Sequence, residues 1–125
     1  MAGEKILVVE DNAVNRRLAE FLLRSHGYKV LEVASAPAAF ELLKQERPDL
    51  ILMDIQLPGM DGLEATKKLK LDPVLCDIPV IAVTSYAMKG DRERALAAGC
   101  AGYLSKPIDK ATLIREIDAC LRRPA

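Results

Sequence analysis

The sequence predicts an α/β fold in which a five-stranded, parallel, doubly wound sheet carries five helices on its two faces. The central observation is the apolar run 50–53, which leads directly into Asp54 and is followed by the turn residues Pro58, Gly59 and Gly62. A continuous apolar run bounded by turn residues is typical of a strand buried on both faces of a parallel sheet. Strand-like and helix-like segments alternate along the chain, and right-handed crossovers then place helices on both sides.

The strands are predicted at residues 5–10, 28–33, 50–54, 78–84 and 102–105. The first helix follows Asp11 or Asn12, either of which can cap it, and ends at His26 and Gly27. We expect its buried face to consist of the apolar residues at helical spacing, which are Val14, Leu18, Phe21 and Leu22.

The other helices are predicted from their caps and from the residues that break them. The second begins after Ser35, the third covers residues 63–70, the fourth runs from about 89 to 98, and the last begins at Asp109. Their apolar positions include Phe40, Leu42 and Leu43, then Leu63, Thr66 and Leu69, and finally Leu113, Ile114, Ile117 and Leu121.

Length and composition restrict the class of protein. The 125 residues indicate a single domain covering 1–125. Eighteen basic and eighteen acidic residues cancel, which argues against a general nucleic-acid binder. No apolar run approaches the roughly 20 residues that span a bilayer, and the N-terminus has no signal-peptide layout. The three cysteines form no metal-binding spacing, so we expect reduced thiols and a cytoplasmic location.

Polar residues stand where the predicted strands end. Asp54 alone is ambiguous, because an aspartate after a strand can serve a site or can simply cap a helix or stabilise a turn. However, Glu10 and Asp11 end the first strand, Thr84 ends the fourth, and Lys106 follows the fifth. In a parallel sheet these side chains meet at one edge, which is where ligands bind in open α/β folds.

Three carboxylates at one edge repel one another and need cations beside them. Lys106 is one such cation, and a hard divalent ion with oxygen ligands is the other. Mg²⁺ suits a site with one or two direct carboxylates and a phosphate oxygen, whereas zinc and copper would call for His or Cys ligands. A carboxylate such as Asp54 can accept a phosphoryl group as an acyl phosphate, so the pattern indicates phosphoryl transfer.

With these motifs the chain resembles the receiver domain of two-component response regulators. The resemblance rests on Glu10-Asp11, Asp54, Thr84-Ser85 and Lys106-Pro107, and it covers about residues 5–121. It implies the flavodoxin-like strand order 2-1-3-4-5, which the chemotaxis member of the family also has. The stretches 53–58 and 86–91 look most like stand-alone cell-division regulators of the DivK type, and similar stretches occur in receiver domains of hybrid histidine kinases.

The resemblance implies that Asp54 accepts a phosphoryl group from a phosphohistidine on a histidine kinase or a histidine phosphotransferase. Asp11, Asp54 and the backbone carbonyl of Gln56 would bind Mg²⁺, and Glu10 would act through a metal-bound water. Many relatives have Asp where this chain has Glu10. Thr84 and Lys106 would contact phosphoryl oxygens, and the Lys106–Pro107 peptide bond would be cis.

The resemblance also implies a switch. Thr84 would move toward the new phosphoryl group and Tyr103 would swing into the space beside the fifth strand. The surface formed by the fourth helix, the fifth strand and the fifth helix would change, and a downstream signalling protein would bind it. The protein would be a monomer or a phosphorylation-promoted dimer. In relatives, positions such as those of Val14, Asn15, Leu18 and Pro107 contact the phosphodonor.

Other functions fit the residues less well. The chain is expected to be a stand-alone switch, although a receiver domain cut from a hybrid histidine kinase would look the same. An aspartate-nucleophile phosphatase would carry a second carboxylate where Gln56 stands. A nucleotide- or flavin-binding module would have GxGxxG or a P-loop after the first strand, and neither occurs there. We therefore expect no enzyme that acts on a separate substrate, and catalysis only of the protein's own phosphorylation and dephosphorylation.

Overall fold

The computed structural model describes residues 3–57, 59–85 and 90–122. Five parallel strands form one sheet in the order β2-β1-β3-β4-β5, which confirms the predicted fold class and strand order. The strands are β1 (Lys5–Val9), β2 (Lys29–Val33), β3 (Leu50–Asp54), β4 (Val80–Thr84) and β5 (Gly102–Ser105). The helices are α1 (Ala13–Ser25), α2 (Ala36–Leu43), α3 (Gly62–Leu71), α4 (Asp91–Ala98) and α5 (Lys110–Leu121).

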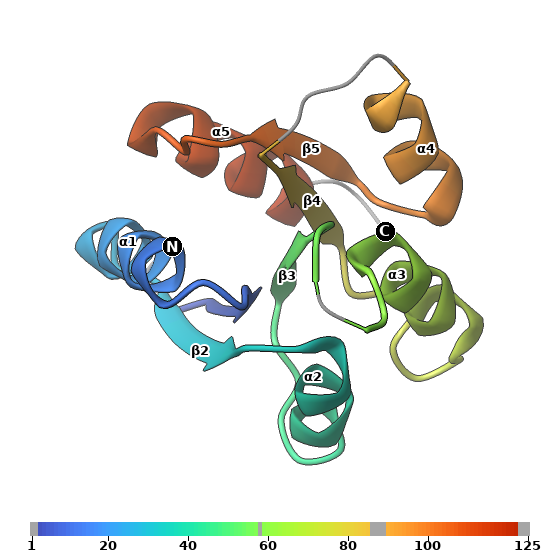
Figure 1. The fold of residues 1–125 in the computed structure, drawn as a ribbon. Helices are drawn as coiled ribbons and strands as arrows, with labels where there is room; N and C mark the ends of the chain where they lie inside the picture. The colour runs from blue at the N-terminus through green and yellow to red at the C-terminus, as the bar shows by residue number, and fades with distance from the viewer. Residues whose placement is uncertain (1–2, 58, 86–89, 123–125) are drawn as a thin grey trace.

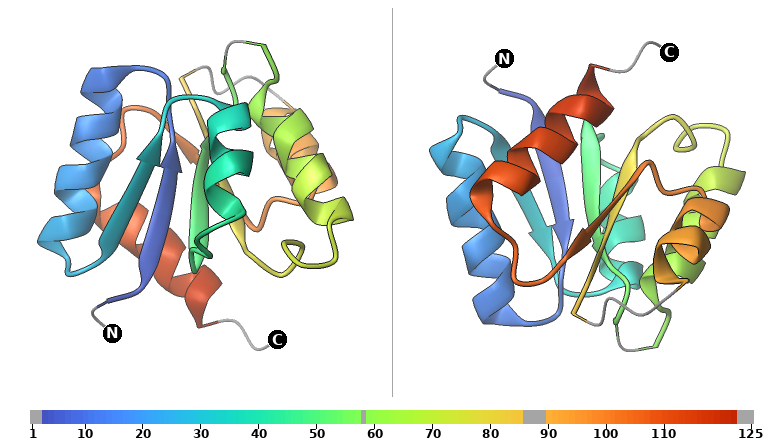
Figure 2. Two further views of the ribbon diagram at one scale, coloured as in Figure 1. Left: turned by 90° about the horizontal axis from the view of Figure 1, so that it is seen from below. Right: turned by 90° about the horizontal axis from the view of Figure 1, so that it is seen from above.

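The sheet lies between two helical layers, with α1 and α5 on one face and α2, α3 and α4 on the other (Figures 1 and 2). Side chains of a strand alternate between the faces. Accordingly, Ile51 and Met53 of β3 join one apolar cluster while Leu50 and Leu52 join the other. All five residues of β3 are buried, as predicted for a central strand. This strand therefore delivers Asp54 from the middle of the sheet to its edge.

The predicted buried face of α1 is wrong for three of its four residues. Val14, Leu18 and Phe21 are 74%, 42% and 69% exposed. The helix instead packs on the sheet through Ala19 and Leu23, with Leu22 partly buried beside them. The sequence carries two apolar stripes at helical spacing, and the one with the small Ala19 lets the helix approach the sheet closely.

Helix starts agree with the predicted caps. Asn12, Ser35 and Asp109 precede α1, α2 and α5, and each side chain accepts a hydrogen bond of 3.0–3.2 Å from the backbone N–H three residues on. Asp61 caps α3 in the same way, at 2.8 Å from the N–H of Glu64. The predicted start of α4 near residue 89 lies outside the described residues, and the helix is described from Asp91.

The strand boundaries match the prediction within one residue at each end, except that β4 begins two residues late, at Val80. Pro79 has no N–H to give to the ladder, although its carbonyl accepts from the N–H of Ile51. None of the helices in the described ranges is both long and apolar enough to cross a membrane. The three cysteines are thiols and form no disulfide with one another.

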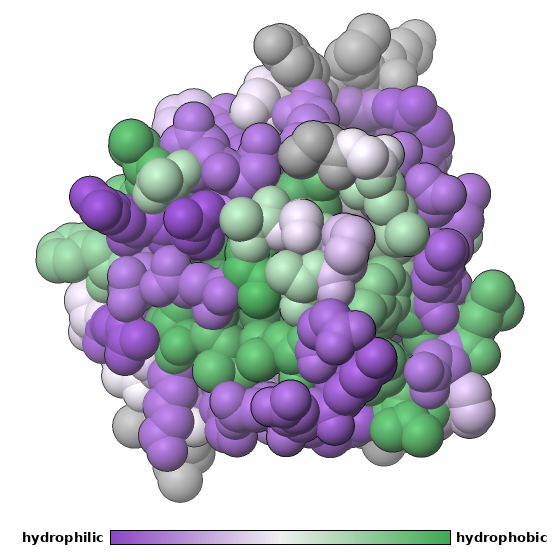
Figure 3. All heavy atoms as spheres, turned by 60° about the horizontal axis from the view of Figure 1, so that its bottom comes forward, coloured by the Kyte–Doolittle hydropathy of each residue, from purple (hydrophilic) through white to green (hydrophobic). Residues whose placement is uncertain are grey.

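The surface on the side that carries α2 is largely hydrophilic, with an apolar area near its centre (Figure 3). On this layer of the fold, partly buried apolar side chains pack against the core from β2 and α2, namely Leu31, Val33, Phe40 and Leu42. The two α2 side chains belong to its predicted apolar face, together with Leu43, which is buried.

Candidate functional site

The acidic residues predicted at the strand ends do converge. Carboxylate oxygens of Glu10, Asp11 and Asp54 all lie within 4.8 Å of one another. Glu10 and Asp54 are buried, at 6% and 3% exposure, while Asp11 is exposed. Because β1 and β3 are neighbouring parallel strands, their carboxyl ends place these groups side by side. The result is a compact negative site at one edge of the sheet.

Lys106 supplies the positive charge inside this cluster. Its Nζ lies 2.5 Å from Glu10 Oε1 and 3.2 Å from Asp54 Oδ2, and its side chain is only 13% exposed. Burial alone disfavours the charged ammonium, but the hydrogen bond to Glu10 and the charges of Asp54 and Glu10 outweigh it, so the pKa of Lys106 is raised. Lys106 is therefore held as a cation between two buried carboxylates.

Backbone amides hold the same two carboxylates from the other side. The N–H of Asn12 donates to Glu10 Oε2 at 3.1 Å, and the N–H of Gln56 donates to Asp54 Oδ1 at 3.0 Å. Hydrogen bonds to an ionised carboxylate are stronger than neutral ones and fix its orientation. Asp54 is thus presented to the cleft in a single orientation.

The loop after β3 is packed tightly against Asp54. A Cβ built on Gly62 would lie 2.1 Å from the backbone oxygen of Asp54, so only glycine allows α3 to begin there. The N–H of Gly62 also donates to the carbonyl of Ile55 at 2.9 Å. The sequence predicts Gly62 only as a turn residue, whereas the structure shows that it permits a close approach of two backbones.

Gln56 and Lys106 connect this loop to the ends of β4 and β5. The N–H of Ser85 donates to Gln56 Oε1 at 3.2 Å, and the N–H of Lys106 donates to the carbonyl of Thr84 at 2.7 Å. The Lys106–Pro107 peptide bond is cis, as predicted. The predicted role of the Gln56 carbonyl as a metal ligand stays a prediction.

Thr84 and Tyr103 lie on adjacent strands. Thr84 is 1% exposed at the end of β4, and Tyr103 is partly buried on β5. Tyr103 pairs with Ala82, which shares a face of β4 with Thr84 because side chains alternate along a strand. Both predicted switch residues therefore belong to the face of the sheet that α2, α3 and α4 cover.

The residues present fit a hard divalent cation. The cleft of about 300 Å³ is lined by oxygen- and nitrogen-bearing residues, and these are Glu10, Asp11, Asn12, Asn15, Asp54, Gln56, Ser85 and Lys106. Three carboxylates and one ammonium leave two uncompensated negative charges. Carboxylate and carbonyl oxygens are the ligands that Mg²⁺ prefers, and the lining set contains no thiol or imidazole that would favour zinc.

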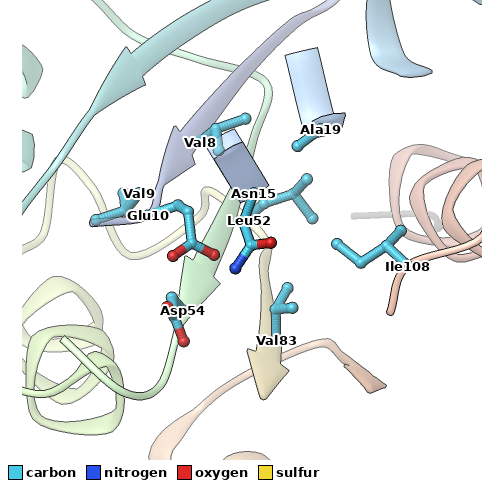
Figure 4. Close-up of a pocket in the computed structure, with 9 residues that line it drawn as sticks. All are labelled: Val8, Val9, Glu10, Asn15, Ala19, Leu52, Asp54, Val83 and Ile108. Carbon is cyan, nitrogen blue, oxygen red and sulfur yellow. The ribbon is translucent and has the colours of Figure 1, made fainter. Parts of the chain in front are cut away.

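Asn15 is a further residue of the site, for which the resemblance to receiver domains implies a contact with the phosphodonor. It lines the cleft and also a small cavity of about 20 Å³ beneath it, and Figure 4 shows its carboxamide pointing from α1 toward Glu10 and Asp54. The rest of the cavity wall is apolar and includes Leu52 and Val83. The signal in the sequence is its position in the first turn of α1, three residues after the Asn12 cap.

Known proteins resemble the chain over almost its whole length. Residues 6–118 match the family described as the response regulator receiver domain. The polar-differentiation response regulator DivK of Brucella anthropi is 48% identical over 118 residues, which cover 94% of this chain and 96% of DivK.

Solved structures agree in fold. The receiver domain of a sensor histidine kinase from Pseudomonas aeruginosa, solved with a magnesium ion coordinated in the active site cleft, has a TM-score of 0.89 and 42% identity, covering 98% of this chain and 100% of its own. The receiver domain of a histidine kinase from Syntrophus aciditrophicus has a TM-score of 0.87 and 31% identity, covering 98% and 95%. Strand order, acidic cluster and sequence similarity agree, and the chain belongs to the response regulator receiver domain family.

Proposed function

We propose that this protein is a phosphorylation switch in which Asp54 accepts a phosphoryl group from a phosphohistidine of a histidine kinase or histidine phosphotransferase. The observation that carries the proposal is the buried Asp54 carboxylate, which is held by Lys106 Nζ and the Gln56 N–H within a cluster of three carboxylates. Its catalysis is confined to its own aspartate, because no second carboxylate stands at position 56 to act as general acid.

In the transfer, an Asp54 oxygen forms a bond to phosphorus while the bond between phosphorus and the imidazole nitrogen breaks, and the nitrogen keeps the electron pair. Lys106 lies 3.2 Å from Asp54 Oδ2 and pairs with an oxygen of the transferred group. The Thr84 hydroxyl donates a hydrogen bond to a second oxygen of the transferred phosphoryl group. Positioning and charge stabilisation of this kind supply most of the catalysis in phosphoryl transfer.

Mg²⁺, when bound, neutralises charge on the cluster and on the phosphoryl oxygens. Asp11 and Asp54 would hold it through their carboxylates, Gln56 through its backbone carbonyl, and Glu10 through a water. The exposed Asp11 carboxylate and the convergence of the three acidic groups support this assignment. A magnesium ion in the cleft of the Pseudomonas receiver domain, which is 42% identical, supports it further.

The exposed apolar stripe of α1 is the docking surface for the phosphodonor. Val14, Leu18 and Phe21 are spaced four and three residues apart, so they lie on one side of the helix. The first turn of the same helix contributes Asn15 to the cleft. A donor helix that packs its apolar face on the stripe would bring its phosphohistidine to Asp54. Such packing of an amphipathic helix on an apolar surface is a common mode of protein recognition.

Phosphorylation adds nearly two negative charges and three strong acceptors beside Thr84. Thr84 moves toward them, and Tyr103 follows into the space on the shared face of the sheet. The surface of α4, β5 and α5 then binds a downstream signalling protein. The packing of Tyr103 against the cluster that includes Ala82 supports this coupling, since Ala82 and Thr84 belong to the same face of β4.

Transfer from a purified phosphohistidine donor tests the proposal. Radiolabelled phosphate is expected to pass from a phosphorylated histidine phosphotransferase to the wild type and not to Asp54→Asn, which keeps the shape of the side chain. Label on the Asn variant, or none on the wild type with any of several donors, would contradict it.

A further inference from the structure

We propose that Arg16 is a positioning residue that holds the loop between β1 and α1 and thereby keeps Glu10 and Asp11 in place to bind Mg²⁺. The inference rests on the proposed function, in which these two acidic residues help to hold the metal. Arg16 lies on α1, six residues after Glu10. It is not among the residues that line the cleft, so it acts through the backbone of residues that are.

The guanidinium group of Arg16 binds the backbone of this loop. Its Nη1 donates to the carbonyl of Glu10 at 2.8 Å and lies 3.5 Å from the carbonyl of Asp11. These two carbonyls belong to the residues whose carboxylates converge with Asp54. A guanidinium is a rigid planar donor, so it restricts both peptide units at once. The Asp11 side chain is exposed, so its direction depends mainly on this backbone.

Glu32 holds the same guanidinium group from the neighbouring strand. Arg16 Nε lies 3.5 Å from Glu32 Oε1, and the two side chains are only 25% and 26% exposed. Glu32 lies on β2, beside which α1 packs (Figure 1). It shares a face of β2 with Val30, which joins the apolar cluster beneath α1. Partly buried charges are screened less by salt than exposed ones. Arg16 therefore ties the acidic loop to β2.

The positioning role and the charge of Arg16 have opposite effects on Mg²⁺ affinity. A positive charge near an acidic cluster by itself disfavours a second cation, so removal of the charge alone would raise the affinity. Fixing the loop has the reverse effect, because a loop that is already ordered pays less entropy when the metal binds. Groups that orient metal ligands commonly contribute about tenfold or more to metal affinity. Loss of Arg16 is therefore expected to weaken Mg²⁺ binding.

The test compares Arg16→Met with Arg17→Met, which removes the same charge from the exposed neighbouring position of α1. Calorimetric titration is expected to show Mg²⁺ affinity about tenfold lower in Arg16→Met and no lower than the wild type in Arg17→Met. In the metal-free proteins, ¹⁵N relaxation is expected to show increased motion of the amides of residues 11 and 12 only in Arg16→Met.

A second variant tests the anchor on β2. Glu32→Gln is expected to lower Mg²⁺ affinity less than Arg16→Met does, because the guanidinium group keeps its contacts with the loop carbonyls. The double variant is expected to bind Mg²⁺ no more weakly than Arg16→Met alone, since Glu32 acts through Arg16. If the two losses of affinity simply add, Glu32 does not act through Arg16, and the proposed tie to β2 is wrong.

Mg²⁺ affinity in Arg16→Met that equals or exceeds that of the wild type would overturn the proposal. A lower melting temperature of Arg16→Met without a loss of Mg²⁺ affinity would also overturn it, because Arg16 would then only stabilise the fold. If the wild type binds Mg²⁺ but takes no phosphoryl group from any donor, the proposed function fails instead. The Mg²⁺ titrations and the metal-free relaxation measurements still decide the role of Arg16 in that case.

Discussion

The ammonium group of Lys106 lies 2.5 Å from the carboxylate of Glu10. This contact is shorter than the one from Lys106 to Asp54, at 3.2 Å. The second oxygen of Glu10 accepts from the Asn12 N–H, so one side chain joins the start of α1 to the cation of the site. Glu10 is therefore a direct partner of Lys106, in addition to its proposed role as a water-mediated metal ligand.

The Glu10–Lys106 contact predicts a pH dependence of stability. The pKa of Lys106 is raised above its ordinary value of 10.5, so the stabilisation is fully present below about pH 10.5 and is lost as pH rises through the higher folded-state pKa. Urea unfolding of the wild type is expected to show a steeper alkaline loss of unfolding free energy than unfolding of Lys106→Met. Parallel alkaline limbs in the two proteins would contradict the raised pKa.

Gly62→Ala is expected to destabilise the protein by about 1–3 kcal/mol, because the new Cβ would meet the Asp54 backbone at 2.1 Å. The loop after β3 would have to shift, so Mg²⁺ affinity is expected to fall as well. Chemical denaturation and calorimetric titration with Mg²⁺ measure the two effects. Glu64→Ala, an exposed change in the same helical turn, is the control and should leave both nearly unchanged. Equal stability of Gly62→Ala and wild type would show that the backbone contact is not tight.

Much of this architecture could be predicted from the sequence, because apolar runs that stop at a charged residue mark both a buried strand and its functional end. The position of Asp54 at the end of β3 and the Asn12 cap of α1 could both be predicted from such local sequence patterns. The exposed stripe of α1 could not be predicted, because the apolar periodicity is compatible with two faces of the helix and does not determine which of them packs against the sheet. Leu18 carries a stronger apolar signal than Ala19, yet Ala19 faces the sheet.

The detailed geometry of contacts between segments that are distant in the sequence also could not be predicted from local sequence patterns. The sequence places Glu10 and Lys106 at one edge of the sheet, but the shorter distance of Lys106 to Glu10 than to Asp54 depends on how β1 and the end of β5 are placed across the sheet. The steric need for Gly62 depends on the path of the chain after Asp54. The cavity beside Asn15 depends on how α1 packs against the sheet. Each is a property of packing and leaves no periodic signal in the sequence.

Phe21→Ala is expected to slow phosphotransfer from a phosphohistidine donor by about tenfold at subsaturating donor, since a large aromatic side chain on an interface often contributes more than about 1 kcal/mol. Phosphorylation by acetyl phosphate, which needs no docking surface, should be unchanged. Leu71→Ala is the matched control, because Leu71 is 83% exposed at the far end of α3. An equal decrease in the phosphotransfer rate of Phe21→Ala and Leu71→Ala would contradict the assignment of the α1 stripe as the docking surface for the phosphodonor.

Thr84→Ala is expected to accept a phosphoryl group, but the resulting conformational change in β5 is expected to be much smaller than in the wild type. The coupling between the site and β5 is expected to be about 1–3 kcal/mol and to require the Thr84 hydroxyl. Amide NMR shifts of residues 102–105 on phosphorylation should shrink in Thr84→Ala and persist in Thr84→Ser, which keeps the hydroxyl. If the shifts in Thr84→Ala match those of the wild type, the switch does not pass through Thr84.

Intact-mass spectrometry after incubation with acetyl phosphate tests the central claim most directly. Wild-type protein and Asp54→Asn are each measured with Mg²⁺ and with Mg²⁺ removed by a chelator. We predict one phosphoryl adduct on the wild type with Mg²⁺, and none after chelation or on Asp54→Asn. An adduct that forms equally well on Asp54→Asn, or without any divalent cation, would contradict the assignment of Asp54 and its acidic neighbours as a metal-dependent phosphoryl acceptor site.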